Sequence, residues 1–245
     1  MSDLVNLGGF QTVAVDSVRK TATLDSDGTS GLNDWVTGVF GTPFPVEVLI
    51  SQTWKPELAQ RVGSAVGAEY ADCHIYGWYG PAMNMHRTAF CGRNFEYYSE
   101  DGVLSGVIAS AEVNGAAEHG VYAYIKHFAL NDQETNRCSF LLTYSDEQAI
   151  REIYLKPFEM CVKNFTGDAL AVMSSFNWIG TKYSGSNPYL LNNVLRGEWG
   201  YRGMVLSDWD GSYGYQLTDD CVRNGNDAML GFNSYESNVL TDTDS

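Results

Sequence analysis

The sequence predicts an α/β fold, namely a (β/α)8 TIM-like barrel that is incomplete at one or both ends. Short apolar runs rich in β-branched residues alternate with segments of helical periodicity, the pattern of βα units repeated around a parallel sheet. Polar residues gather directly after several of these runs, where such a barrel carries its active site. About six or seven strand candidates can be counted, fewer than the eight of a closed barrel. Either the barrel is open, or neighbouring segments complete it.

The predicted strands are short and apolar, as strands of a parallel sheet covered on both faces are. They cover residues 44–50, 74–83, 121–128, 170–176 and 204–207, with a weaker candidate at 11–15. The predicted helices cover residues 56–70, 103–118, 146–165 and 189–198. We expect Ser145 to cap the longest helix and Pro157 to kink it.

Size and charge limit the kinds of ligand. The chain has 245 residues, 44% of them hydrophobic, and we expect residues 1–245 to form a single domain. A formal net charge of −15 repels nucleic-acid phosphates and anionic lipids, so the expected ligand is neutral or cationic. No run reaches the roughly 18 apolar residues of a membrane span, and no signal peptide is seen. We expect no nucleic-acid or membrane partner and a cytoplasmic location, unless a leader has been removed.

The cysteines and histidines show no disulfide or metal pattern. The five cysteines are odd in number and contain no CxxC pair, and the four histidines lack the spacing of a zinc site. We therefore expect no metal and no other cofactor.

Asp208 is the first candidate for a chemical role. It follows the apolar run 204–207 and precedes Trp209. A carboxylate at the mouth of a barrel beside an aromatic ring is what a glycosidase nucleophile and its sugar platform require. A helix-capping or loop carboxylate has the same local sequence.

Other polar positions allow two interpretations each. Lys126 and His127 end a predicted strand, where they either donate hydrogen bonds to vicinal hydroxyls or form a salt bridge and a structural contact. Arg93 belongs to a loop at 91–101 that is dense in charged and aromatic residues, which suits a polyhydroxyl ligand or a solvated surface. Asp27 by itself is typical of a turn.

Together these residues resemble glycoside hydrolase family 3, the β-glucosidase family. The resemblance runs through residues 27–231 in consistent order, and its most specific motifs are GRNFEYYSED at 92–101 and SDW at 207–209. The other matching segments are 27–28, 80–87, 126–137, 151–159 and 195–200.

The resemblance implies a retaining β-glycosidase, β-glucosidase-like, that hydrolyses terminal non-reducing β-D-glucosyl residues through a covalent glycosyl-enzyme intermediate. At the matching positions Asp208 is the nucleophile. The substrate-binding positions are Asp27, Arg93, Lys126, His127, Met173 and Trp209. Arg137 also lies in a family motif near the site.

The chain departs from the family pattern in three ways. Phe176 stands where many members have a tyrosine close to the nucleophile, which removes a hydrogen bond and favours lower activity. Thr29 replaces the commoner proline after Asp27 and Gly28, which loosens a turn. The family begins earlier and continues into a second α/β domain, so the chain resembles only part of such an enzyme.

The resemblance assigns no residue to protonate the leaving oxygen. In most β-glucosidases of the family the acid/base glutamate lies on the second domain, which implies a missing domain or a partner subunit here. The hexosaminidase branch uses a barrel-loop histidine that residues 128–134 lack, so Asp132 and Glu134 are the fallback candidates. The alternatives to a β-glucosidase are a β-xylosidase of the same family and a non-hydrolytic sugar-binding barrel fragment.

Overall fold

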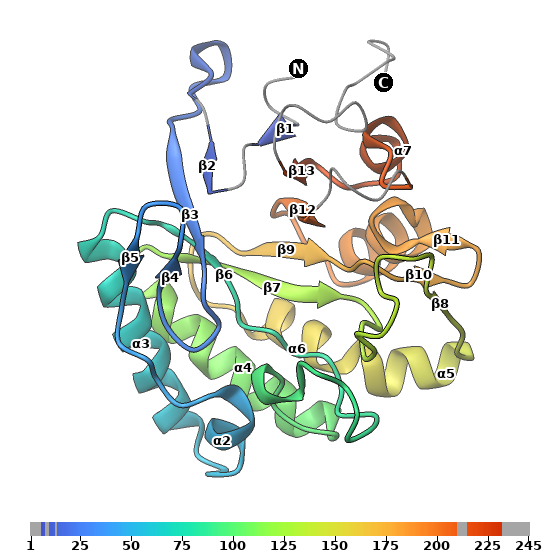
Figure 1. Cartoon of the computed structure of the whole chain (residues 1–245), viewed down its shortest axis with the longest axis horizontal. Helices are drawn as coiled ribbons and strands as arrows, with labels where there is room; N and C mark the ends of the chain where they lie inside the picture. Colours follow the sequence, from blue (N-terminus) through green and yellow to red (C-terminus); the bar gives the residue numbers. More distant parts are fainter. Residues whose placement is uncertain (1–5, 8–9, 13, 210–214, 232–245) are drawn as a thin grey trace.

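The computed structural model describes residues 6–7, 10–12, 14–209 and 215–231. Its central strands are β1 (Asn6–Leu7), β3 (Thr23–Asp27), β6 (Gly77–Tyr79), β7 (Tyr122–Phe128), β9 (Ala171–Ser174), β12 (Val205–Trp209) and β13 (Ala228–Leu230). They form a parallel sheet in the order β1, β13, β12, β9, β7, β6, β3 (Figure 1). Within the described residues no pairing joins β1 to β3, so the prediction of an incomplete barrel is confirmed.

Short antiparallel strands extend this sheet, and three further short strands form a second sheet. The short strands are β2 (Gln11–Thr12), β4 (Asn33–Asp34), β5 (Val39–Phe40), β8 (Leu142–Thr143), β10 (Trp178–Ile179) and β11 (Lys182–Tyr183). β2 and β4 pair with β3, and β5 pairs with β4. β8, β10 and β11 form the second sheet, near the ends of β7 and β9 in Figure 1, and in it β10 pairs antiparallel with β11 and parallel with β8.

Helices cover the outer face of the sheet. Below the sheet in Figure 1 lie α3 (Pro56–Asp72), α4 (Gly102–Ala117) and α6 (Lys156–Asn164). Between these helices and the strands lies an apolar core that includes Val66, Ile108, Phe158 and Val172. Tyr79, Tyr124, Met173 and Leu206 belong to a second cluster, so β6, β7, β9 and β12 are buried on both faces. None of the described helices is both long and apolar enough to cross a membrane.

Most predicted strands are confirmed, and one is wrong. The segments 11–15, 74–83, 121–128 and 170–176 contain β2, β6, β7 and β9, and the segment 204–207 overlaps the first three residues of β12. Residues 44–50 were expected to form a strand, but Glu47–Ser51 form the helix α2. A short apolar run does not by itself separate a strand from a buried helix, and an acidic residue in the first turn, here Glu47, favours the helix.

The helix predicted at 146–165 is divided. It consists of α5 (Glu147–Ala149), a π-helical turn (Ile150–Tyr154) and α6. Asp146 caps it instead of Ser145, because the Asp146 carboxylate accepts a hydrogen bond from the Ala149 N–H at 2.8 Å. Pro157 lies in the first turn of α6, where its missing N–H costs no helical bond, so it begins a helix and does not kink one.

The other predicted helices are confirmed as α3, α4 and a π-helical segment at Tyr189–Glu198. The remaining helical elements are 3₁₀ turns at Asp16–Val18, Asn94–Glu96 and Ser184–Ser186, and α7 (Thr218–Arg223).

Close contact between α3 and α4 depends on glycine. A Cβ atom at Gly63 would lie 1.9 Å from the carbonyl oxygen of Glu112, and one at Gly115 would lie 2.1 Å from that of Gln60.

We expect Gly63→Ala to lower the free energy of unfolding by about 2 kcal/mol, because separating the helices costs more than the roughly 1 kcal/mol that alanine gains in helix propensity. Urea denaturation measures this. Gly92→Ala is the control, since its added Cβ meets no atom within 4 Å; a Gly63→Ala protein as stable as this control contradicts the expectation.

Candidate active site

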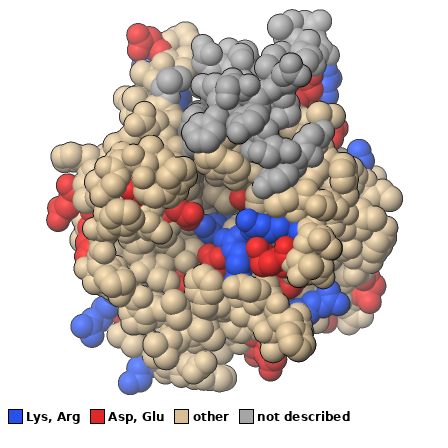
Figure 2. All heavy atoms as spheres, viewed as in Figure 1, with Lys and Arg blue, Asp and Glu red and all other residues tan. Residues whose placement is uncertain are grey.

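A pocket of about 410 Å³ lies where the C-terminal ends of the parallel strands meet. In the view of Figure 2 the surface is hollowed near its centre, and basic and acidic side chains line the hollow. The pocket residues are Phe10, Asp27, Trp35, Tyr79, Arg93, Lys126, His127, Arg137, Met173, Phe176, Asp208, Trp209 and Leu230. They come from six strands and the loops around them, so the barrel topology brings together residues far apart in the chain.

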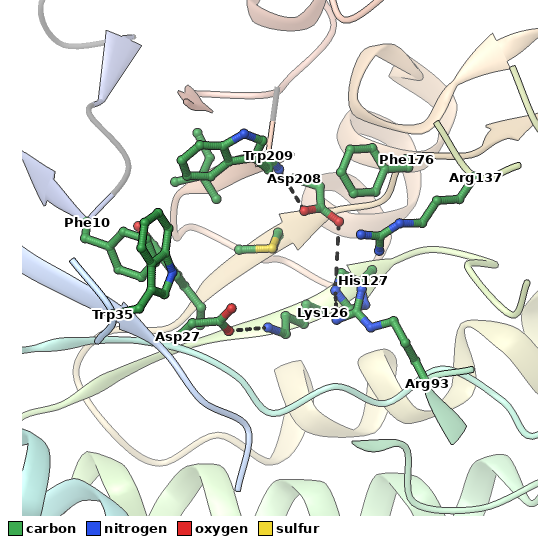
Figure 3. A pocket seen from close by; sticks show the side chains of 13 residues that line it. Phe10, Asp27, Trp35, Arg93, Lys126, His127, Arg137, Phe176, Asp208 and Trp209 are labelled. Carbon is green, nitrogen blue, oxygen red and sulfur yellow. Dashed lines mark hydrogen bonds and ion pairs between the residues drawn. The ribbon is translucent and has the colours of Figure 1, made fainter. Parts of the chain in front are cut away.

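Asp27 and Lys126 form an ion pair on one side of the pocket (Figure 3). Lys126 Nζ donates to Asp27 Oδ1 at 3.0 Å, and the backbone N–H of Gly28 donates to the same oxygen at 3.0 Å. Burial acts to raise the pKa of Asp27, but the ammonium of Lys126 and the Gly28 N–H outweigh it, so the pKa lies below its ordinary value. Asp27 is an ionised acceptor, and half of its side-chain surface faces the open pocket.

His127 is buried and neutral. Burial lowers the pKa of its imidazole well below the usual range, and the charges of Arg93 and Lys126 lower it further. Nε2 lies 2.9 Å from Arg93 Nη2 and must be the acceptor, because a guanidinium only donates. The ring proton is therefore on Nδ1, which lies 3.3 Å from Asn84 Oδ1. Nε2 is also 3.8 Å from Asp208 Oδ2, but it has no proton to donate to that carboxylate.

Asp208 lies on β12 with 7% of its surface exposed. Its Oδ1 accepts the backbone N–H of Trp209 at 2.7 Å, while Oδ2 has no hydrogen-bond partner among the described residues. Burial raises the pKa of Asp208 above its ordinary value, and the charges of Arg137, Arg93 and Lys126 limit that rise. The side chain therefore presents one oxygen with free lone pairs to the pocket, as a nucleophile must.

Arg93 connects the 91–101 loop to the pocket floor. It immediately precedes the 3₁₀ turn Asn94–Glu96, and its guanidinium donates to Glu96 as well as to His127. Because both partners are buried, the guanidinium is held in a fixed position. It offers the pocket directional donors of the kind that bind sugar hydroxyls.

Aromatic rings form two walls of the pocket. Trp209 and Phe176 lie beside Asp208, whereas Phe10 and Trp35 lie beside Asp27 (Figure 3). The rings of Phe10 and Trp35 meet edge to face at 5.4 Å. Neither residue was predicted from the sequence. The available signal was Trp35, a large aromatic residue in the polar loop that follows Asp27, and it is 59% exposed.

The structure brings every predicted substrate-binding position into this one pocket together with Asp208, but it does not bring the two fallback acids there. Asp132 accepts the Met85 N–H at 2.8 Å and faces a different pocket. Glu134 pairs with Arg137 at 3.2 Å and does not line the pocket. Among the described residues that line it, the carboxylates are those of Asp27 and Asp208.

Within the described part of the chain, no group of three His, Cys, Asp or Glu side chains could hold a metal ion.

An open (β/α)8 barrel with carboxylates, cations and aromatic rings in one pocket defines a barrel domain suited to a small polyhydroxyl ligand. The comparisons agree. The Glycosyl hydrolase family 3 N terminal domain matches residues 13–224. The chain belongs to glycoside hydrolase family 3.

Relatives with solved structures share the fold closely. A β-glucosidase 3B from Thermotoga neapolitana, solved in complex with glucose, is 42% identical with a TM-score of 0.81 over 90% of this chain and 31% of its own. A family 3 β-glucosidase from Bifidobacterium adolescentis is 34% identical with a TM-score of 0.85, over 94% of this chain and 33% of its own.

Curated relatives give the same family. A β-glucosidase from Rhizobium radiobacter is 42% identical over 207 residues, which are 83% of this chain and 25% of that protein. β-Glucosidase A from Butyrivibrio fibrisolvens is 42% identical over 79% of this chain and 23% of its own length. The chain thus spans about a quarter of the length of these relatives.

Proposed function

We propose that this chain is the barrel part of a retaining β-glycosidase that releases terminal non-reducing β-D-glucosyl residues, with Asp208 as its nucleophile. The observation that carries the proposal is the environment of Asp208: buried, near three cations and with one oxygen unpartnered among the described residues. The β-glucosidase names of relatives at 42% identity support the choice of sugar.

In the proposed reaction, a carboxylate oxygen of Asp208 attacks the anomeric carbon of the sugar. The bond from that carbon to the leaving oxygen breaks, and a general acid gives the oxygen its proton. Water then gives a proton to the conjugate base of that acid and attacks the anomeric carbon, which breaks the ester bond and restores the Asp208 carboxylate, so the sugar leaves with its β configuration retained. Asp27, Arg93 and Lys126 bind hydroxyls of the sugar.

The proton donor in this proposal lies outside the described residues. Retaining hydrolysis needs a second carboxyl about 5 to 5.5 Å from the nucleophile. Asp27 is the other carboxylate of the described pocket lining, and its low pKa keeps it ionised where a general acid must be protonated. A second domain or a partner subunit is the proposed source.

The experiment is hydrolysis of nitrophenyl β-glucoside, β-xyloside, N-acetyl-β-glucosaminide and α-glucoside, with NMR detection of the first anomer released. We expect the β-glucoside to react fastest and to yield β-glucose first. A faster β-xyloside establishes the β-xylosidase alternative, and release of the α anomer contradicts the retaining mechanism.

A 2-fluoro-β-glucosyl fluoride tests the chain where a proton donor is lacking. Fluoride leaves the anomeric carbon with its bonding electrons and needs no protonation, and the second fluorine slows hydrolysis of the ester. We expect mass spectrometry to find the sugar on Asp208. Binding of glucose without turnover or labelling favours the non-hydrolytic sugar-binding alternative.

A substitution of Lys126 tests the proposed binding of sugar hydroxyls by Asp27 and Lys126. Lys126→Met removes the cation that holds Asp27 and one charged donor, so we expect kcat/KM for the β-glucoside to fall roughly 10- to 100-fold. Lys163→Met is the control, because Lys163 is exposed and pairs with Glu159 on the outer helix. Equal activities of the two variants contradict a role for Lys126 in binding.

A further inference from the structure

The Oδ2 atom of Asp208 lacks a hydrogen-bond donor among the described residues although the side chain is buried. The nearest ring nitrogen, His127 Nε2, is 3.8 Å away, and its lone pair is used by Arg93. Phe176, whose ring lies beside Asp208 in Figure 3, has no hydroxyl to donate. A buried carboxylate in this position needs another source of stabilisation to stay ionised.

Two of the cations in the pocket are engaged elsewhere. Lys126 donates to Asp27 at 3.0 Å. Arg93 donates to Glu96 and to His127. Their charges still act on Asp208 over distance, but the hydrogen bonds that they make within the described residues are directed at other groups.

Arg137 is the remaining cation that lines the pocket. Its guanidinium carbon lies 4.5 Å from the centre of the Phe176 ring, a cation–π contact. Its Nη1 lies 3.2 Å from Glu134 Oε2, but Nη1 has no partner in hydrogen-bonding geometry among the described residues. Figure 3 shows the guanidinium pointing toward Asp208 and His127.

We infer that Arg137, held on the face of Phe176 and anchored by Glu134, is the positioning residue that keeps Asp208 ionised. The ring fixes the guanidinium in place, so a stacked cation supplies the stabilisation that a hydroxyl at position 176 would otherwise give. Of the charges that lower the pKa of Asp208 against the effect of burial, that of Arg137 acts most strongly. The inference rests on the proposed role of Asp208 as nucleophile.

The first test is a titration of the Asp208 carboxyl by carbon-13 NMR, with the signal assigned from Asp208→Asn. In Arg137→Gln we expect the midpoint to move up by about 1 pH unit, because an opposite charge nearby favours ionisation. Arg137→Lys keeps the charge and is expected to restore most of the shift. Arg151→Gln removes an arginine from a surface pair with Glu198 and is expected to change nothing. An unmoved midpoint in Arg137→Gln overturns the inference.

The second test follows the rate of labelling by the 2-fluoro-β-glucosyl fluoride against pH. The acid limb is expected to move with the titration midpoint, so Arg137→Gln labels about tenfold more slowly on that limb. Labelling that is absent in the unmodified chain, with the titration shift present, rejects the proposed function and leaves the electrostatic pairing intact. Labelling with an unchanged acid limb rejects the pairing and leaves the function intact.

Phe176→Tyr makes the test independent of folding defects. The new hydroxyl gives Asp208 a donor, so in this background Arg137→Gln is expected to shift the midpoint by less than it does alone. A double-mutant cycle measures that coupling. Shifts that add without coupling show that Arg137 and position 176 act separately, which overturns the inference.

Discussion

Asp208→Ala is expected to lower the hydrolysis of an aryl β-glucoside by about 10⁴-fold or more, because it removes the proposed covalent nucleophile and with it the ester pathway. The stability of the folded chain is expected to stay the same or to rise. Asp208 is buried with a raised pKa, so its charge destabilises the folded chain above that pKa and its removal relieves the cost. Initial rates with nitrophenyl β-glucoside and a thermal melt together measure both parts of this expectation.

Azide identifies the lost group chemically. In Asp208→Ala a small anion can enter the space of the carboxylate and attack the anomeric carbon from the same side, which gives an α-glycosyl azide. Loss of a general acid/base would give the β-azide, since the nucleophile would remain. Asp27→Ala removes the other pocket carboxylate and is the matched control: azide should not restore its activity. A β-azide from Asp208→Ala contradicts the assignment.

Glu112 is expected to make the chain less stable at pH 8 than at pH 4.5. It lies on α4 with 1% of its surface exposed, and its Oε2 accepts the Tyr98 hydroxyl at 2.6 Å. Burial raises its pKa from 4.5 to about 7. Between these values the folded chain holds a proton that the unfolded chain releases, so the free energy of unfolding falls as pH rises, by about 3 kcal/mol in all.

Glu112→Gln removes this titration. Glutamine keeps an acceptor for Tyr98, and its amide can donate to the neighbouring carboxyl of Glu47, whose Oε1 has no partner among the described residues. Urea denaturation at several pH values should show a flatter profile and a higher stability at pH 8. Glu118→Gln, at the exposed end of the same helix, should keep the slope of the unmodified chain. The same slope in both variants contradicts the expectation.

The fold was predictable from the sequence wherever apolar strands are buried on both faces. The segments 121–128 and 170–176 begin with apolar runs that are typical of buried parallel strands, and they contain β7 and β9. β3 and β13 were missed. β3 carries Asp25 and Asp27, so its sequence does not look like that of a buried strand. Asp25 is nevertheless buried, and the hydroxyls of Tyr122 and Tyr124 on β7 donate hydrogen bonds to it. Such partners are 97 and 99 residues away in the chain.

Site residues were predictable from the sequence where a charged residue stands at the end of an apolar strand. They were not predictable where the side chain comes from a loop that is distant in the sequence. Lys126 and Asp208 stand at the ends of apolar runs, so a barrel places them at one rim. Phe10 and Trp35 reach the pocket through the packing of β2, β4 and their loops onto β3. The sequence holds no periodic signal for that contact. The tautomer of His127 likewise depends on Asn84 and Arg93, which come from separate segments.

The walls of the pocket come from widely separated parts of the chain. Phe10 and Asp27 precede nearly all of the barrel helices, and Leu230 lies on the last described strand. During synthesis the lining of the cavity is therefore complete only after β13 has emerged and joined β12. A ligand that contacts the whole lining binds the chain with β13 in place, so ligand occupancy and the docking of β13 against β12 are thermodynamically linked.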